Sequence, residues 1–200
     1  MNKNSKLFLN HVIETCLANN ISLVLNQDAP CLVDNEGSFN GDTVQVNMKV
    51  AKSDWNYTLA HELSHLHQKL EHSTVWNNAW VKYHGVKRRA SGIYNDWIDG
   101  KRIGKKVAKK CCQKIVQLEL DCEIRTIKLI KHWRLPINMT KYIQNANMVI
   151  YSYVFSLKHC YFNLIDPKSF NKLMPKKLLK NYQSYFDTYE KFDKEFLKFI

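Results

Sequence analysis

No stretch of this sequence holds the roughly 18 consecutive apolar residues that a membrane-spanning helix needs. The opening segment, MNKNSKLFLNHVIETCLANN, also lacks the unbroken apolar core and the cleavage site of a secretory signal. We therefore expect a cytoplasmic protein that has no membrane partner. At 200 residues and 45% apolar content, the chain is long enough for one domain with a hydrophobic core and too apolar to be disordered.

Paired cysteine motifs are missing as well. None of the cysteines forms a CxxC pair, and the adjacent Cys111 and Cys112 do not have the spacing of a zinc ribbon or finger. Without an export signal, reduced thiols are expected rather than disulfides, so we interpret the cysteines as small buried hydrophobic residues. The six are Cys16, Cys31, Cys111, Cys112, Cys122 and Cys160.

Acidic residues are scarce in the middle of the chain. The net charge is −3 over residues 1–81, +10 over residues 82–134 and +5 over residues 135–200. Within the basic segment, the stretch KRRASGIYNDWIDGKRIGKK mixes cations with aromatic residues, which is typical of phosphate contacts combined with base stacking. Segment 82–134 is therefore a possible nucleic-acid partner surface. The alternative is a solvated loop whose aromatic residues anchor it in the core.

Hydrophobic periodicity predicts an α+β fold that is mainly helical. We expect a small, mostly antiparallel N-terminal sheet and a single domain, with a catalytic core at 1–134 and a helical extension at 135–200. Residues 82–106 hold four of the six glycines and predict a long loop or two short elements. The expected helices cover 5–19, 54–72 with Ser53 as N-cap, 103–133, 139–160 and 177–199, and the expected strands cover 21–26, 31–34 and 43–50.

The stretch HELSHLHQ at 61–68 carries the most specific chemistry. On an α-helix, His61 and His65 lie about 40° apart on one face, so both imidazoles can reach one metal ion. The leucine stripe of the same helix points in another direction. Glu62 lies too far around to be a natural third ligand, but it can reach a water molecule held by the metal. Two histidine ligands and a general base are the arrangement of HExxH zinc hydrolases, whereas the alternative is a helix with unrelated surface histidines.

A catalytic zinc ion needs a third protein ligand. His72 shares the histidine face but lies about 10 Å further along an unbroken helix, so it reaches the ion only if the helix breaks first. The adjacent His67 points off this face. Glu119 and Glu123 are better placed, since they are four residues apart on one face of a second predicted helix. The alternative is that both glutamates are exposed and pair with Lys or Arg.

The HExxH motif followed by Glu119-x-x-Cys122-Glu123 resembles the gluzincin pattern. It is most similar to the small phage and bacterial metallopeptidases of the ImmA/IrrE type, over about residues 43–133. The resemblance implies that Glu119 is the third zinc ligand, that Cys122 occupies the small-residue position, and that Glu123 orients a ligand histidine by a hydrogen bond. Glu123 stands where that family has Asn or Asp, so an exchange of roles between the two glutamates stays open.

These residues predict a zinc-dependent metallopeptidase that acts on a protein or peptide substrate. His61, His65 and Glu119 would hold Zn²⁺, and Glu62 would accept a proton from the attacking water and deliver it to the leaving nitrogen. Strand 43–50 could pair with an extended substrate if it lies at a sheet edge.

Two matters stay open from the sequence. The oxyanion stabiliser could be any of four residues: Tyr57, Tyr83, His84 or Tyr94. The rival function is a basic, non-enzymatic nucleic-acid-binding protein in which the metal helix is structural or degenerate.

Overall fold

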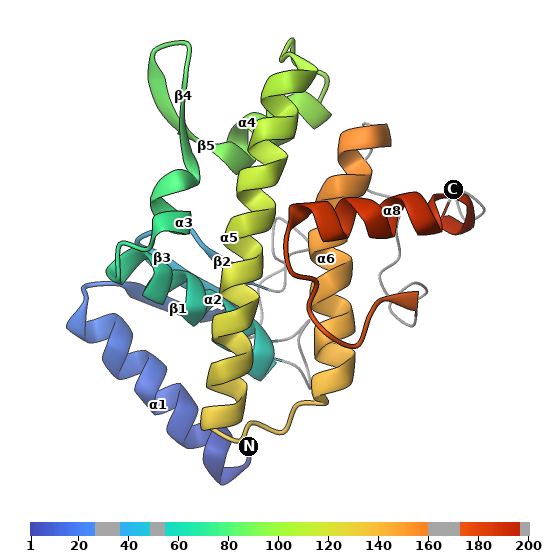
Figure 1. Cartoon of the computed structure of the whole chain (residues 1–200). Helices are drawn as coiled ribbons and strands as arrows, with labels where there is room; N and C mark the ends of the chain where they lie inside the picture. The colour runs from blue at the N-terminus through green and yellow to red at the C-terminus, as the bar shows by residue number, and fades with distance from the viewer. Residues whose placement is uncertain (27–36, 49–54, 160–172, 197–200) are drawn as a thin grey trace. The chain divides into compact units, whose positions relative to one another are not determined.

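The structure is a computed structural model that describes residues 1–26, 37–48, 55–159 and 173–196 (Figure 1). Within these ranges the fold is α+β and mainly helical, as the sequence predicted. No helix in the described ranges is both long and apolar enough to cross a membrane.

The chain divides into two compact units, each assembled from two stretches of sequence. The first unit comprises Met1–Ser73 and Cys122–Asn138, and the second comprises Thr74–Asp121 and Met139–Ile200. Helix α5 (Lys105–His132) contributes to both units. The predicted single domain, with a core at 1–134 and an extension at 135–200, stays a prediction.

The first unit contains a three-stranded mixed sheet in the order β1-β3-β2. Strand β1 (Ser22–Asn26) runs parallel to β3 (Thr43–Asn47), and β2 (Gly37–Phe39) runs antiparallel to β3. The prediction of a mostly antiparallel sheet was wrong for the β1–β3 pair, because β2 is part of the long connection that a parallel pair needs. The predicted strand 31–34 lies outside the described residues.

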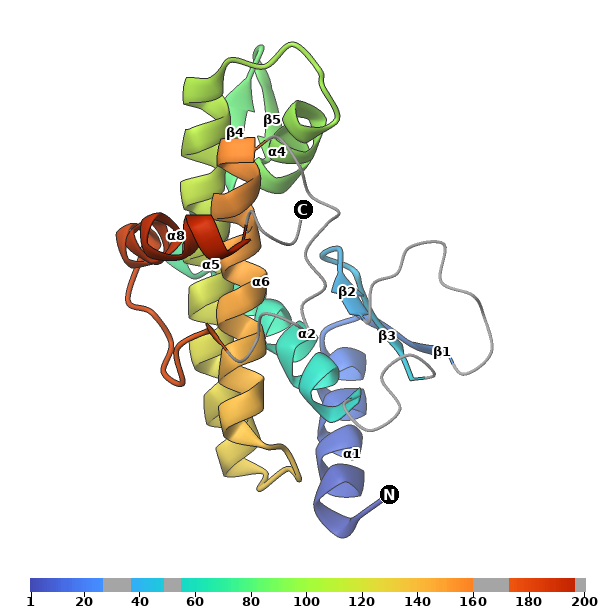
Figure 2. The ribbon, with the colours of Figure 1, turned by 90° about the vertical axis from the view of Figure 1, so that its right-hand side faces the viewer.

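Two helices cover one face of this sheet, α1 (Lys3–Ala18) and α2 (Trp55–Leu70) (Figure 2). Asn2 caps α1 by accepting a hydrogen bond from the backbone N–H of Ser5 at 2.8 Å. In β3, Val44 and Val46 are fully buried while Thr43 and Gln45 are half-buried, but Asn47 is buried as well. The core of the first unit consists mainly of Phe8, Val12, Cys16, Val44, Val46, Leu59, Leu63 and Leu66.

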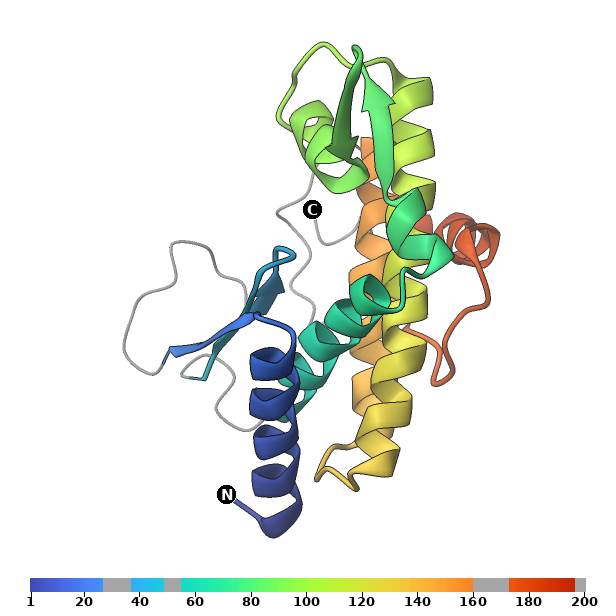
Figure 3. The same ribbon diagram turned by 90° about the vertical axis from the view of Figure 1, so that its left-hand side faces the viewer.

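The second unit begins with α3 (Thr74–Asn78) and the hairpin of β4 (Trp80–Tyr83) and β5 (Val86–Arg89). Both turn residues, His84 and Gly85, have positive φ, which is the conformation of a two-residue type I′ turn. Helix α4 (Ala90–Ile98) follows directly. Figure 3 shows the hairpin and α4 beside the first turns of α5. The glycine-rich segment thus forms short elements, one of the two outcomes that the sequence allowed.

The core of the second unit packs α5 and α4 against α6 (Met139–His159) and α8 (Tyr182–Phe196). Tyr94 donates its hydroxyl hydrogen to the carbonyl of Tyr153 at 2.6 Å. The fully buried Asn147 on α6 donates to the carbonyls of Pro175 and Lys177, and its Oδ1 accepts from the Tyr185 hydroxyl at 2.8 Å. The side-chain amide of Asn147 therefore links α6 both to α8 and to the segment before α8.

Gly37 of β2 packs closely against α2. A Cβ atom at this position would lie 2.5 Å from Thr58 Cγ2 and 3.1 Å from Glu62 Oε1. Thr58 is buried and β-branched, so its methyl group has little freedom to move away. We expect Gly37→Ala to lower the free energy of unfolding by about 1–3 kcal/mol, measured by urea denaturation with circular dichroism.

Gly104→Ala is the matched control, because a Cβ atom there would meet nothing within 4 Å. It should leave stability unchanged or raise it slightly. Adding Thr58→Ser to Gly37→Ala removes the Cγ2 methyl group that the new Cβ atom would approach. The double variant should therefore regain part of the lost free energy of unfolding. Equal stability of the two glycine variants would contradict the close packing of β2 on α2.

Candidate metal centre

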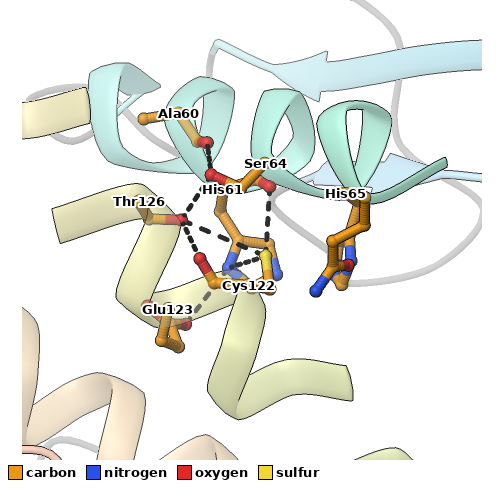
Figure 4. A network of polar contacts seen from close by, with 8 residues as sticks. Ala60, His61, Ser64, His65, Cys122, Glu123 and Thr126 are labelled. Carbon is orange, nitrogen blue, oxygen red and sulfur yellow. Dashed lines mark hydrogen bonds and ion pairs between the residues drawn. The ribbon is translucent and has the colours of Figure 1, made fainter. Parts of the chain in front are cut away.

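Small side chains join α2 to the C-terminal half of α5 within the first unit (Figure 4). The hydroxyl of Ser64 donates to the carbonyl of Ala60 at 2.8 Å. Thr126 Oγ1 lies 2.9 Å from Ser64 Oγ and 2.9 Å from the carbonyl oxygen of Cys122, so its single proton serves both acceptors. Ser64, Cys122 and Thr126 are fully buried, and their small size lets the two helix backbones approach closely.

This approach brings a carboxylate to the first histidine of the motif. Glu123 Oε1 lies 3.1 Å from Nδ1 of His61, and its side chain is only 7% exposed. Figure 4 shows His61 pointing from α2 toward Cys122 and Glu123 on α5. When Nδ1 carries the hydrogen of this contact, the lone pair of a neutral imidazole is on Nε2. Glu123 thus occupies the position of a carboxylate that orients a ligand histidine.

The second histidine has the same kind of anchor on its own helix. His65 Nδ1 lies 2.8 Å from Oε1 of Gln68, which can only accept a hydrogen bond. The lone pair of His65 is therefore also on Nε2. The rings of His61 and His65 are nearly perpendicular, at 88°, with centroids 4.8 Å apart. Each imidazole thus has a partner at Nδ1 that can fix its orientation, as metal-binding histidines require.

The charge of this cluster favours a cation. Burial lowers the pKa of His61, but Cys122 and Glu123 beside its ring outweigh that effect, so the pKa lies well above its ordinary value. These two neighbours therefore favour a positive charge at the His61 ring, and a metal ion that binds there can supply it.

Glu62 lies on the side of α2 that faces the sheet. Its side chain is buried, and its Oε1 is the atom that a Cβ on Gly37 of β2 would approach to 3.1 Å. Strand β3 is paired on both sides, so the proposal that 43–50 could serve as an edge strand was wrong. Among the residues that the structure describes, β2 is the edge strand next to Glu62.

Three potential ligand atoms converge in the first unit. The ligand atoms of His61, His65 and Cys122 all lie within 4.8 Å of one another, and zinc accepts a His₂Cys donor set. The Cys122 Sγ, however, lies 3.6 Å from His61 Nδ1, the nitrogen that Glu123 contacts, and donates to the His61 carbonyl at 3.3 Å. A site that uses Cys122 therefore competes with the Glu123 anchor, whereas a site that uses Nε2 of His61 retains it.

Glu119, the predicted third ligand, belongs to the second unit. It is half-buried on α5, one turn before Cys122 and Glu123. Burial lowers the pKa of Arg89, and the charge of Glu119 acts in the opposite direction. Glu119 and Glu123 are four residues apart on α5 and share a face of the helix. The role of Glu119 as a zinc ligand stays a prediction.

The other residues considered from the sequence lie as follows. Helix α2 ends at Leu70, and His72 lies beyond it, exposed and with a φ of 49°. Among the oxyanion candidates, the Tyr94 hydroxyl donates to a carbonyl in the core of the second unit, and Tyr83 packs edge-on against His84. Tyr57 is the one candidate on α2 itself, one turn before His61.

Sequence reasoning gave no role to several residues that shape this site. Gln68 is three residues after His65 on the same predicted helix, and this spacing was the signal for a side-chain hydrogen bond. Ser64 and Thr126 gave a weaker signal, as small polar residues on two predicted helices. Gly37 lies between two predicted strands, and only its packing against α2 shows why a glycine is needed.

Comparison of the chain with protein-family models, with curated proteins and with solved structures finds no match. The interpretation of this centre therefore depends on its own residues and contacts.

Glu123 offers a direct test of the anchor. If its carboxylate orients His61, Glu123→Ala should weaken zinc binding about 10–100-fold, measured by competition with a chromophoric chelator. Glu71→Ala is the matched control, because Glu71 is a glutamate of the same unit that pairs with Arg125 at 2.7 Å. Equal zinc affinity of the Glu123 variant and the wild type would contradict the anchoring role.

Proposed function

We propose that this chain is a zinc-dependent metallopeptidase. The observation that carries the proposal is that His61 and His65 are held in the same way. Nδ1 of His61 contacts a side-chain oxygen of Glu123, and Nδ1 of His65 contacts the side-chain oxygen of Gln68. Ligand histidines use such contacts to fix the tautomer and the orientation of the ring. The buried Glu62 between them in sequence supplies the expected base.

His61 and His65 would hold the metal through Nε2, and Glu119 would be the third ligand. The donor set of two imidazoles and one carboxylate is that of many zinc peptidases, and it leaves a position for water. Glu123 would then act on the centre indirectly, by holding the ring of His61. This assignment gives each glutamate of the α5 motif one role.

The chemistry follows from these roles. Zinc, when bound, supplies Lewis acidity that acidifies water and polarises a peptide carbonyl. Glu62 accepts the proton of the attacking water and transfers it to the departing amine nitrogen. The low exposure of Glu62 removes bulk water as a competing proton acceptor. Its position beside β2 places the proton transfer next to an edge strand of the sheet.

We further propose that the enzyme acts in the cytoplasm on a protein or peptide substrate. The four cysteines that the structure describes, Cys16, Cys111, Cys112 and Cys122, are all buried free thiols. Reduced cysteines are typical of a reducing compartment.

A structural metal site is the second candidate, and the proximity of Cys122 favours it. A centre of His61, His65 and Cys122 would use a thiolate ligand and would break the His61–Glu123 contact. Such a site would stabilise the α2–α5 contact without hydrolysing peptides. Such a site corresponds to the rival function, a non-enzymatic nucleic-acid-binding protein in which the metal helix is structural.

Single-residue variants separate these functions. We expect one equivalent of zinc by elemental analysis of the wild type, and loss of zinc in His61→Ala, His65→Ala and Glu119→Ala. Glu62→Gln should retain zinc but lose cleavage of a proteome-derived peptide library followed by mass spectrometry. Cys122→Ala should retain both zinc and cleavage.

The reverse outcomes have clear meanings. Zinc lost in Cys122→Ala but kept in Glu119→Ala would support the structural site. A wild type that binds no zinc, or cleavage that is equal in the wild type and Glu62→Gln, would refute the metallopeptidase.

A further inference from the structure

The β4–β5 hairpin of the second unit sorts its side chains onto two faces. Trp80 opposes Arg89 and Lys82 opposes Lys87 in the register of the two strands. Because side chains alternate along a strand, these four residues share one face, which we name the cationic face. The other residues of β4 pack against the core of the second unit, so the cationic face points away from it.

Two lysines of the cationic face form an unfavourable pair. Lys82 and Lys87 are exposed and lie directly opposite each other, where like charges destabilise a hairpin. In the described part of the chain, neither lysine has a carboxylate within ion-pair distance. An anion bound between them would turn this repulsion into attraction.

The neighbouring cations behave differently. Arg88, on the opposite face of β5, pairs with Asp96 of α4 at 2.7 Å. Lys101 pairs with the same carboxylate at 2.5 Å. The fold thus neutralises Arg88 and Lys101 beside α4. On the cationic face, the charge of Glu119 acts on Arg89, whereas Lys82 and Lys87 are left to an external partner.

Aromatic rings hold part of the cationic face in place. The Arg89 guanidinium lies 4.5 Å from the ring centroid of Trp76 and 5.4 Å from that of Trp80. Lys87 Nζ lies 5.7 Å from the centroid of Trp80. These cation–π contacts order the two cations before a ligand arrives, which reduces the entropy lost on binding.

The surroundings extend the positive charge. Residues 80–114 contain eleven Lys/Arg and only two Asp. The first turns of α5, beside the hairpin in Figure 3, expose Lys105, Lys106, Lys109 and Lys110 at the positive end of the helix dipole, an unfavourable place for cations. Val86 is the one exposed large apolar side chain of residues 80–114, all of which the structure describes. A membrane-binding surface needs more apolar area than this.

We propose that the cationic face binds the phosphate backbone of nucleic acid. Lys82 and Lys87 would contact phosphates, and Arg89 would add a third cation positioned by Trp76 and Trp80. A two-stranded ribbon also has the width that the major groove of a duplex admits. This site lies in the second unit and is independent of the metal centre, so it holds whether or not the chain is a peptidase.

Fluorescence anisotropy with labelled duplex DNA, single-stranded DNA and RNA of equal length tests the proposal across a range of salt concentrations. The wild type should bind at low salt, with affinity falling linearly on a log–log plot against salt. The Lys82→Ala/Lys87→Ala variant should lose at least about tenfold in affinity and reduce the slope for duplex DNA by about 1.8. The three probes show which nucleic acid supplies the phosphates.

Lys176→Ala/Lys177→Ala is the matched control, because it removes the same charge from two exposed lysines of the same unit. Lys87→Glu gives a second readout: it replaces a repulsive cross-strand pair by an attractive one, so the melting temperature should rise while binding is lost. His61→Ala should bind nucleic acid like the wild type.

Four results would overturn the proposal. They are no binding of any probe at low salt, equal losses in the two double variants, tighter binding of poly-glutamate or anionic vesicles than of nucleic acid, and loss of binding in His61→Ala.

Discussion

The contact between α2 and the C-terminal half of α5 is the interaction on which the metal centre depends. Ser64, Cys122 and Thr126 are buried and small, and their hydroxyl and thiol groups bond to helix carbonyls and to one another. Larger side chains would separate the helices and withdraw Glu123 from His61. The HExxH motif supplies the histidines, but this helix contact determines how one of them is oriented.

Helix α2 is packed on several sides, and a different set of side chains makes the contacts on each side. Its leucines fill the core of the first unit, Thr58 and Glu62 pack against Gly37, and Ser64 meets α5. The histidines lie between the side that faces the sheet and the side that faces α5. The proposed base and the two proposed histidine ligands thus contact neighbouring elements, which is the support that a catalytic centre would need.

The sequence predicted those features that depend on local periodicity. The long helices, the strand at β3 and the shared face of His61 and His65 all follow from spacing of 3.6 or 2 residues. Features that depend on distant partners were not predicted. The parallel pairing of β1, the closeness of Gly37 to Thr58 and the proximity of the Cys122 thiol to His61 Nδ1 arise from packing between segments far apart in the chain. The hairpin was missed because its turn is His-Gly rather than the usual Asn-Gly.

The coordination of the metal is the central claim, and zinc K-edge X-ray absorption of the wild type loaded with one equivalent of zinc tests it most directly. Binding through Nε2 of His61 and His65 with a carboxylate predicts imidazole scattering and a first shell of nitrogen and oxygen at about 2.0–2.2 Å. A sulfur shell at about 2.3 Å would show that Cys122 is a ligand. That result, or a spectrum without imidazole scattering, would contradict the account.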